Sequence, residues 1–406
     1  MKNKPLVSIA RNQDIETAVA EVLDRIELPD LSSKRILLKP NVAREVEANT
    51  AINTNPAVVK AVFEYLFKRF KAEYFLGDSP IVLSETHRAF EKAGYKELMA
   101  DPRLKYLDLD EPPPMKLEIP NGLIIKGIRV TGYWSHFDYI ISIPVLKMHM
   151  HTGASLSFKN CKGLLYKRDK VLLHHQQAPD VVEPMQKINP RVKELDIAIG
   201  DLSLVIQPHL AIIDATFALE GLGPSSGNAK KMDTIIASTD FLAADIVALA
   251  LTQPTWTLDH VPHLKSIADR REPHGPYTIS EINIQPSDIT PFIVQLEAPP
   301  KSITLQYTNV TVIDKESCSA CVATLFMFLK NNQEFINAHF TRDHPLNLVI
   351  GRGIRAVDLY EPAFLIGNCT ACRQNDGIFI KGCAPVESVI RRAIEEHLDL
   401  HADPNN

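Results

Sequence analysis

Short apolar runs that end abruptly in polar residues recur along this chain, and they constrain its fold more than any other feature. The run ILL leads into Lys39, the run YFLG leads into Asp78, and the run IISIPVL leads into Lys147. After the first run, Asn55 suits a helix N-cap and Pro56 suits the first helical position. Buried strands that alternate with helices are typical of βαβ units, so the pattern predicts an α/β fold with a mostly parallel sheet.

The same rhythm divides the 406 residues into two parts. Residues 1–285 are expected to form a large α/β domain. Prolines accumulate in 286–303, which predicts a linker or an edge meander. Residues 304–406 then repeat strands and helices on a smaller scale, which predicts a second α/β domain that carries five of the six cysteines.

Composition excludes several classes of protein. The formal net charge of -5 gives no general basic field, so we expect no nucleic-acid partner. No stretch approaches the roughly 18 apolar residues of a membrane span, so we expect no membrane insertion. The first residues lack a long apolar signal segment, which predicts a cytoplasmic protein. Six cysteines are too few for a disulfide scaffold and favour metal binding or redox chemistry.

Cysteines follow three of the strands predicted in the C-terminal domain. Cys318 and Cys321 form a C-x-x-C after TNVTVID, Cys369 and Cys372 form another after PAFLIGN, and Cys383 follows GIFIKG. The carboxyl ends of strands in an open α/β sheet line one crevice. These thiols can therefore converge on one cofactor, and a cubane [4Fe-4S] cluster needs four soft thiolate ligands.

Zinc is the alternative cofactor, because two C-x-x-C pairs can form a tetrahedral four-thiolate site. Structural zinc sites usually take pairs that lie closer in sequence than the 47 residues between Cys321 and Cys369, so we favour the cluster. The continuous cysteine run of bacterial ferredoxins is absent. Cys161, far from the others, is either a buried structural thiol or a further ligand.

The last hundred residues resemble the proximal-cluster domain of nickel-iron hydrogenase small subunits and a related subunit of respiratory complex I. The similarity is carried by the first C-x-x-C, by Gly367-Asn368-Cys369 and by Gly382-Cys383-Ala384-Pro385, where Ala384 replaces the usual first proline. The resemblance implies a flavodoxin-like domain with one [4Fe-4S] cluster. By position it implies ligands at Cys318, Cys321, Cys369 and Cys383, with Cys372 as an alternative ligand.

The large domain resembles the uncharacterised "domain of unknown function 362" family, whose members are commonly described as iron-sulfur cluster-binding proteins. The marks are LKPN at 38–41, NTNP at 53–56, GDSP at 77–80, IPVLKMH at 143–149 followed by TGASLSFKNCKG, and EGLGPSSG at 220–227. The family name implies little about the reaction.

A second site is predicted where polar residues follow the strands of the large domain, because such residues meet at the carboxyl edge of a parallel sheet. A small anionic molecule suits lysine donors, and histidines can move protons near neutral pH. The residues predicted to bind this substrate are Lys39, Asn41, Asp78, Lys159 and Asn160, and those predicted to act in catalysis are Lys147, His149 and His174. Alternatively, the histidines are capping or surface groups. Asp214 and Glu220 are either acid-base groups or caps.

Together these features predict an iron-sulfur oxidoreductase, or an electron-transfer component, that acts on a small anionic molecule and exchanges electrons with a redox protein. Two alternatives stay open. In one, the cluster acts as a Lewis acid in a non-redox lyase or isomerase. In the other, zinc stabilises a binding protein that has no catalytic chemistry.

Overall fold

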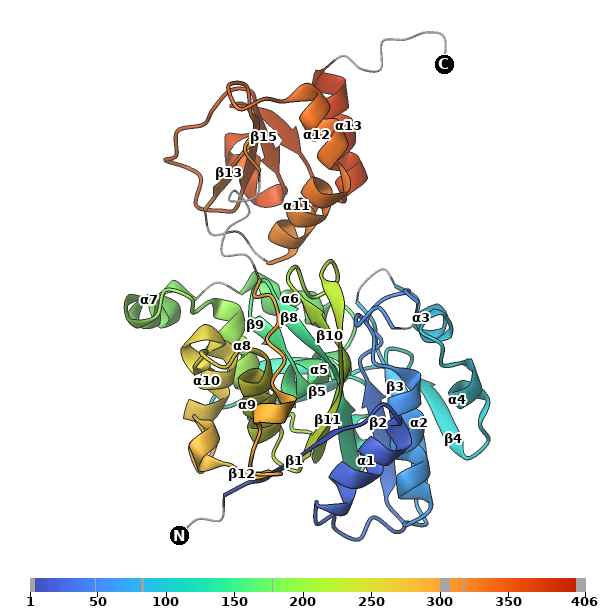
Figure 1. Ribbon diagram of the computed structural model, residues 1–406. Coiled ribbons are helices and arrows are strands. Elements are labelled where there is room, and N and C mark those ends of the chain that lie inside the picture. Colours follow the sequence, from blue (N-terminus) through green and yellow to red (C-terminus); the bar gives the residue numbers. More distant parts are fainter. Residues whose placement is uncertain are drawn as a thin grey trace. The chain divides into compact units, whose positions relative to one another are not determined.

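The computed structural model describes residues 4–47, 49–81, 84–176, 178–299, 307–315, 317 and 319–398. The chain divides into two compact units, Met1–Pro299 (unit 1) and Pro300–Asn406 (unit 2) (Figure 1).

Unit 1 is built on a ten-stranded sheet. Eight of its strands lie in the order β12-β1-β11-β10-β7-β2-β3-β4, and the other two are β8, which pairs with β10, and β9, which pairs with β8. The run from β10 to β4 is parallel, whereas β11 pairs antiparallel with both β10 and β1. The α/β class and the largely parallel sheet are therefore confirmed. The strands are β1 Leu6–Arg11, β2 Arg35–Pro40, β3 Glu73–Asp78, β4 Leu104–Asp108, β7 Tyr139–Ile143, β8 Val145–His149, β9 Gly153–Ser155, β10 Leu210–Glu220, β11 Asn228–Ser238 and β12 Asn283–Gln285; β5 Met115–Glu118 and β6 Gly127–Val130 form a separate pair.

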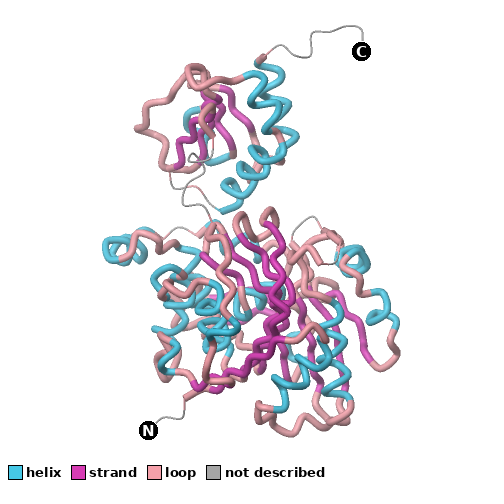
Figure 2. The backbone as a smooth tube through the Cα atoms, viewed as in Figure 1, coloured by secondary structure: helices cyan, strands magenta, loops and turns pink. Residues whose placement is uncertain are grey.

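Helices cover both faces of this sheet, as Figure 2 shows. Leu37 packs into one apolar cluster, while its neighbours Ile36 and Leu38 pack into the other, as alternation along a strand requires. The first cluster includes residues of α8, α9 and α10, and the second includes residues of α1 and α2. The helices are α1 Ile15–Asp24, α2 Pro56–Phe67, α3 Thr86–Lys92, α4 Lys96–Ala100, α5 Ser157–Asn160, α6 Asp169–Leu172, α7 Pro179–Ile188, α8 Glu194–Leu202, α9 Phe241–Thr252 and α10 Pro262–Arg270.

Two local features compare directly with the sequence. Helix α2 begins as expected: the side chain of Asn55 accepts a hydrogen bond from the Ala57 amide at 3.0 Å, and Pro56 is the first helical residue. The apolar run IISIPVL before Lys147 reads as one strand in the sequence but forms two, β7 and β8, which are separated by Pro144. Proline cannot donate a hydrogen bond to a neighbouring strand. Strand β8 pairs with β10, and Lys147 lies opposite Leu219.

Unit 2 contains a four-stranded parallel sheet with the order β13-β14-β15-β16. Its described strands follow chain order, which is simpler than the 2-1-3-4-5 order of flavodoxin-like sheets. The strands are β13 Val310–Asp314, β14 Leu346–Ile350, β15 Ala363–Ile366 and β16 Ile378–Ile380, and the helices are α11 Ser319–Asn331, α12 Gln333–His339 and α13 Glu387–His397.

The proline-rich segment before unit 2 packs on unit 1 as far as Pro299. The amides of Val294 and Leu296 donate to the carbonyls of Leu251 and Thr252 at 2.9 and 3.0 Å, and Leu296 is buried. Among the described helices of both units, none has the length and apolar character needed to cross a membrane.

The buried carboxylate of Asp245 anchors α5, the short helix that carries Lys159 and Asn160. It accepts hydrogen bonds from the amides of Ser157 at 2.8 Å and Phe158 at 3.2 Å, and from the Ser157 hydroxyl. We expect Asp245→Ala to lower the free energy of unfolding by about 3 kcal/mol, because buried donors lose their acceptor.

Urea denaturation measures this loss, with Asp259→Ala as the matched control. Asp259 is exposed, and among the described residues its side chain makes only a 4.0 Å ion pair with Lys265, so its removal is expected to change stability by less than about 0.5 kcal/mol. Equal effects of the two substitutions would contradict the anchoring role of Asp245.

Candidate functional site

The ends of β2 and β3 meet in a buried ion pair. Because these parallel strands are neighbours, Lys39 and Asp78 come together, with 2.6 Å between Lys39 Nζ and Asp78 Oδ1. Lys39 also donates to Asn160 Oδ1 at 3.2 Å, and Asp78 Oδ2 accepts from the Val42 amide at 2.7 Å. Three of the residues predicted to bind substrate thus lie together, and Asp78 neutralises the charge of Lys39.

A glycine lets the backbone cover this ion pair. A Cβ atom at Gly163 would lie 2.1 Å from Asp78 Oδ1 and 2.6 Å from Lys39 Nζ, which is closer than packed atoms tolerate. Gly163 belongs to the 3-10 helix Cys161–Leu164, directly after α5. Any larger residue here would push the turn away from the carboxyl edge of the sheet.

Lys147 is buried without a carboxylate partner among the described residues. It lies on β8, is 4% exposed, and donates to Asn41 Oδ1 at 2.5 Å and to the Ile52 carbonyl at 2.6 Å. Burial lowers the pKa of Lys147 to about 7, and the positive charge of Arg44 acts in the same direction. Near neutral pH this amine is therefore poised between its charged and neutral forms.

Lys159 and His149 share a second buried environment. Lys159 is 7% exposed and donates to the Thr152 hydroxyl at 2.9 Å, and no described carboxylate forms a salt bridge with it. Burial lowers its pKa, and the nearby charges of Lys162 and Lys147 lower it further. Burial and the charge of Lys159 also lower the pKa of His149, whose Nδ1 accepts from the His151 amide at 3.1 Å.

Lys162 and His174 form a third contact, with 2.8 Å between Lys162 Nζ and His174 Nε2. A hydrogen bond at this distance requires that only one of the two atoms carry the shared proton. Burial lowers the pKa of Lys162 to about 8, with a further contribution from Lys170. Lys162 was not predicted as a site residue, although it lies in the run TGASLSFKNCKG that follows His149 and His151.

We call the group Lys147, Lys159, Lys162, His149 and His174 the lysine site. Within the described part of the chain, its three lysines donate only to neutral acceptors. An ammonium group that is buried without a counter-charge is costly, and its pKa falls as a result. The site therefore has the electrostatics of an anion-binding site, and its amines can also exchange protons near neutral pH.

A groove of about 830 Å³ lies at the carboxyl ends of β3 and β4. It is lined by both acidic and basic residues, among them Glu85, Asp108, Glu111, Arg168 and Lys170. Lys170 is paired there with Asp110 at 2.7 Å. Lys147 and Lys159 do not line this groove, which is a feature separate from the lysine site.

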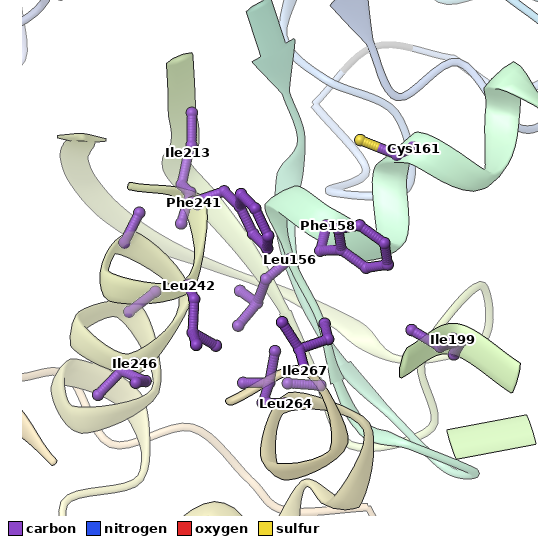
Figure 3. Close-up of a cluster of buried hydrophobic side chains, with 14 of the residues drawn as sticks. Leu156, Phe158, Cys161, Ile199, Ile213, Phe241, Leu242, Ile246, Leu264 and Ile267 are labelled. Carbon is purple, nitrogen blue, oxygen red and sulfur yellow. The ribbon is translucent and has the colours of Figure 1, made fainter. Parts of the chain in front are cut away.

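Three other candidates have mainly structural contacts. Asp214 Oδ2 accepts from the Asn55 amide at 2.8 Å and its Oδ1 accepts from the Thr216 amide at 2.9 Å, which orients both backbones. Glu220 accepts from the Glu297 amide at 2.9 Å. Cys161 lies in the apolar cluster near Phe158 (Figure 3), and burial raises the pKa of its thiol to about 12.

The cysteine-bearing segments of unit 2 also approach one another. The Asn368 amide donates to the Gly382 carbonyl at 2.8 Å, and the Gly382 amide donates to Asn368 Oδ1 at 2.9 Å. Gly367 has φ +96°, and a Cβ atom there would lie 3.1 Å from Cys321 Sγ. The buried sulfur of Cys321 thus lies against the backbone between the loops that carry Cys369 and Cys383.

This arrangement fits a thiolate-ligated cofactor in its donor set and in the close approach at Gly367. Cys321 is buried, whereas Cys369, Cys372 and Cys383 are exposed. Cys318 lies outside the described residues. Among the residues that are described, no three Cys, His, Asp or Glu side chains are grouped closely enough to hold one metal ion.

Residues 36–250, more than half of the chain, match the family model "Domain of unknown function (DUF362)". The chain belongs to this family. A thylakoid-associated protein of Synechocystis sp. is 27% identical over 225 residues, which are 54% of this chain and 63% of that protein. The match thus spans less than two thirds of the relative's length. A cytoplasmic location for this chain stays a prediction.

Two solved structures are distantly similar. A Thermotoga maritima protein has a TM-score of 0.34 at 15% identity, covering 59% of this chain and 58% of that one. The lactate racemase apoprotein of Thermoanaerobacterium thermosaccharolyticum has a TM-score of 0.36 at 10% identity, covering 58% of this chain and 54% of its own. Similarity at this level establishes neither a common fold nor a common activity.

Replacement of a buried lysine by methionine is expected to have different effects at Lys147, which lacks a described carboxylate partner, and at Lys39, which is paired with Asp78. Lys147→Met removes an uncompensated charge, so we expect a free energy of unfolding equal to or above that of the wild type. Lys39→Met leaves Asp78 buried without its partner, which is expected to cost about 3–5 kcal/mol.

Urea denaturation at pH 7 without added anions compares the two variants. A large loss of stability in Lys147→Met would show that this lysine belongs to a stabilising network, contrary to our interpretation.

Proposed function

We propose that this member of the DUF362 family is an iron-sulfur oxidoreductase, or the cluster-bearing component of one, that acts on a small anionic molecule. The observation that carries the substrate class is the lysine site, where Lys147, Lys159 and Lys162 lack described carboxylate partners. Their neutral acceptors leave their charges available to a ligand.

The chemistry of the lysine site suits a carboxylate or phosphate group. Lysine ammonium groups bind such anions as point charges, and their interaction strengthens where water is excluded. Asn41 holds Lys147, and Thr152 holds Lys159, so the donors have fixed positions before a ligand arrives. Lys39 and Asp78 support this edge as a neutral pair, through Asn160, and do not contribute free charge.

The same residues can manage protons during a reaction. Burial holds the pKa of Lys147 near 7 and keeps His149 neutral, so both can accept a proton as negative charge develops on a ligand. His174 shares a hydrogen bond with Lys162 and can exchange its proton with that amine. We assign catalytic roles to Lys147, His149 and His174 on this basis.

In unit 2 we propose that Cys321, Cys369 and Cys383, together with Cys318, hold a [4Fe-4S] cluster, with Cys372 as the alternative ligand. Bound there, the cluster would supply single electrons for reduction or oxidation. Three of the described cysteines are exposed, which suits exchange of electrons with a redox protein. Support comes from the loops tied by Asn368 and Gly382 and from the contact of Cys321 with Gly367.

Metal analysis of anaerobically purified protein tests the cofactor. We expect about four irons and four acid-labile sulfides per chain, with a brown absorption that dithionite bleaches. Cys383→Ser is expected to lose most of the iron. Cys161→Ser is the matched control and is expected to keep it, because Cys161 lies in the apolar core of unit 1.

A different metal or sulfide content of the purified protein would support one of the two alternative functions. One zinc per chain without sulfide would refute the cluster and favour a zinc-stabilised binding protein. A cluster with no redox response that still converts a substrate would favour Lewis-acid chemistry.

Anion binding should weaken as the pH rises. The pKa values of Lys147 and Lys162 are lowered to about 7 and about 8, so both amines are charged below this range and lose their charge above it. An anion binds the charged form, and we expect affinity to fall about tenfold or more between pH 6 and pH 9.

Isothermal titration calorimetry with sulfate measures this, because the charge of sulfate is constant over that range. Lys60→Met is the control, since Lys60 is an exposed lysine outside the site. Affinity that does not depend on pH would contradict the proposed role of the lysines.

A further inference from the structure

Arg44 has a half-buried side chain and forms no salt bridge with any residue that the structure describes. It lies in the loop that follows β2, three residues beyond Asn41. Burial lowers the pKa of Arg44, but an arginine stays charged at any ordinary pH. A permanent charge that is partly withdrawn from water without a counter-charge is costly. Its presence at the carboxyl edge of the sheet therefore calls for a specific explanation.

Two carboxylates contact the loop that carries Arg44, and both are engaged with other groups. Glu45 Oε1 accepts from a backbone amide at 3.0 Å, and its Oε2 lies 3.9 Å from Arg88 Nε. Asp78 accepts from an amide of the loop at 2.7 Å and is the ion-pair partner of Lys39. The positive charge of the Arg44 guanidinium is therefore available to a ligand.

The side chain of Asn53 fixes the backbone from which Arg44 projects. Asn53 is 5% exposed, and its Oδ1 accepts from the amides of Ala43 at 3.0 Å and Arg44 at 3.4 Å. Its Nδ2 donates to the Arg44 carbonyl at 2.8 Å. The fold thus sets the position of Arg44 before any ligand arrives, which lowers the cost of binding.

The same two segments of the chain hold Lys147. Its ammonium group donates to Asn41 Oδ1 at 2.5 Å and to the Ile52 carbonyl at 2.6 Å. Asn41 belongs to the loop that carries Arg44, and Ile52 directly precedes Asn53. The charge of Arg44 accordingly acts on Lys147 and contributes to its lowered pKa. Two cationic groups of different shape thus lie at one end of the lysine site.

We infer that Arg44 is a further substrate-binding residue, whose guanidinium holds a carboxylate or phosphate group of the ligand through two parallel hydrogen bonds beside Lys147. A guanidinium presents its N–H groups as a rigid fork that matches two oxygens of such a group, whereas an ammonium group acts as a point charge. Arg44 therefore orients the oxyanion group that Lys147 attracts. The inference rests on the proposed binding of anions by the lysine site.

Arg44→Lys tests the fork, because lysine keeps the positive charge but cannot donate two parallel hydrogen bonds. Calorimetry at pH 6 uses acetate as the probe for a carboxylate group and sulfate as the probe for a phosphate group. We expect the affinity for at least one of these anions to fall about tenfold in Arg44→Lys, and to fall at least as far in Arg44→Met. The anion that loses more affinity identifies the group that Arg44 holds.

Arg88→Lys is the matched control, since the side chain of Arg88 is 68% exposed and lies beside Glu45 of the same loop. This variant is expected to bind both anions as the wild type does. Urea denaturation checks that the Arg44 variants are folded, and loss of a charge without a described partner is not expected to lower their stability. If Arg44→Lys bound both anions within about twofold of the wild-type affinity, the inference would be overturned.

A ligand-free measurement separates this inference from the proposed function. Nuclear magnetic resonance of the ¹³C-labelled side chain of Lys147 follows its titration in the protein without added anions. Loss of the neighbouring positive charge in Arg44→Met is expected to raise the midpoint, and Arg44→Lys is expected to leave it close to that of the wild type. An unchanged midpoint in Arg44→Met would overturn the inference, because the two cations would then lie too far apart to share one ligand group. A raised midpoint in a protein that binds neither anion would overturn the proposed anion site, and with it the ligand assigned to Arg44.

Discussion

The buried ion pair between Lys39 and Asp78 is the contact on which the rest of the carboxyl edge depends. It joins the ends of β2 and β3, and through Asn160 it reaches α5. The turn at Gly163 closes over it with no room for a side chain. Each charge has its partner, so the pair can remain in the interior. Breaking it would leave a bare charge there, which is far more costly than replacing the whole pair.

In the lysine site, by contrast, the buried lysines have no described partner of opposite charge. Lys147 and Lys159 are nearly as buried as Lys39, yet their described partners are neutral oxygens. The cost appears as lowered pKa values and not as disorder, because α5 and β8 are held by other contacts such as those of Asp245. A scaffold stabilised elsewhere can thus maintain a site whose charge is unsatisfied until a ligand binds.

The sequence predicted the α/β class and the place of the polar residues, because apolar runs ending in Lys39, Asp78 and Lys147 obey the geometry of parallel sheets. It could not show that Lys39 and Asp78 neutralise each other, since the pairing depends on strand order. Thr152 and Lys162 were missed because their contacts with Lys159 and His174 are set by the folded backbone and leave no motif in the sequence. The cysteine spacing remains a prediction about a cofactor.

The two proposed halves of the function fit each other chemically. Reduction of a bound anion adds negative charge, and a buried site of low dielectric stabilises that charge only if protons or cations accompany it. Amines with pKa values of about 7 and about 8 take up protons as the local negative charge grows. A lysine that was fully charged at the start could not respond in this way. The unusual feature of this protein is therefore that its positive charge is adjustable, which suits a reaction in which electrons and protons arrive together.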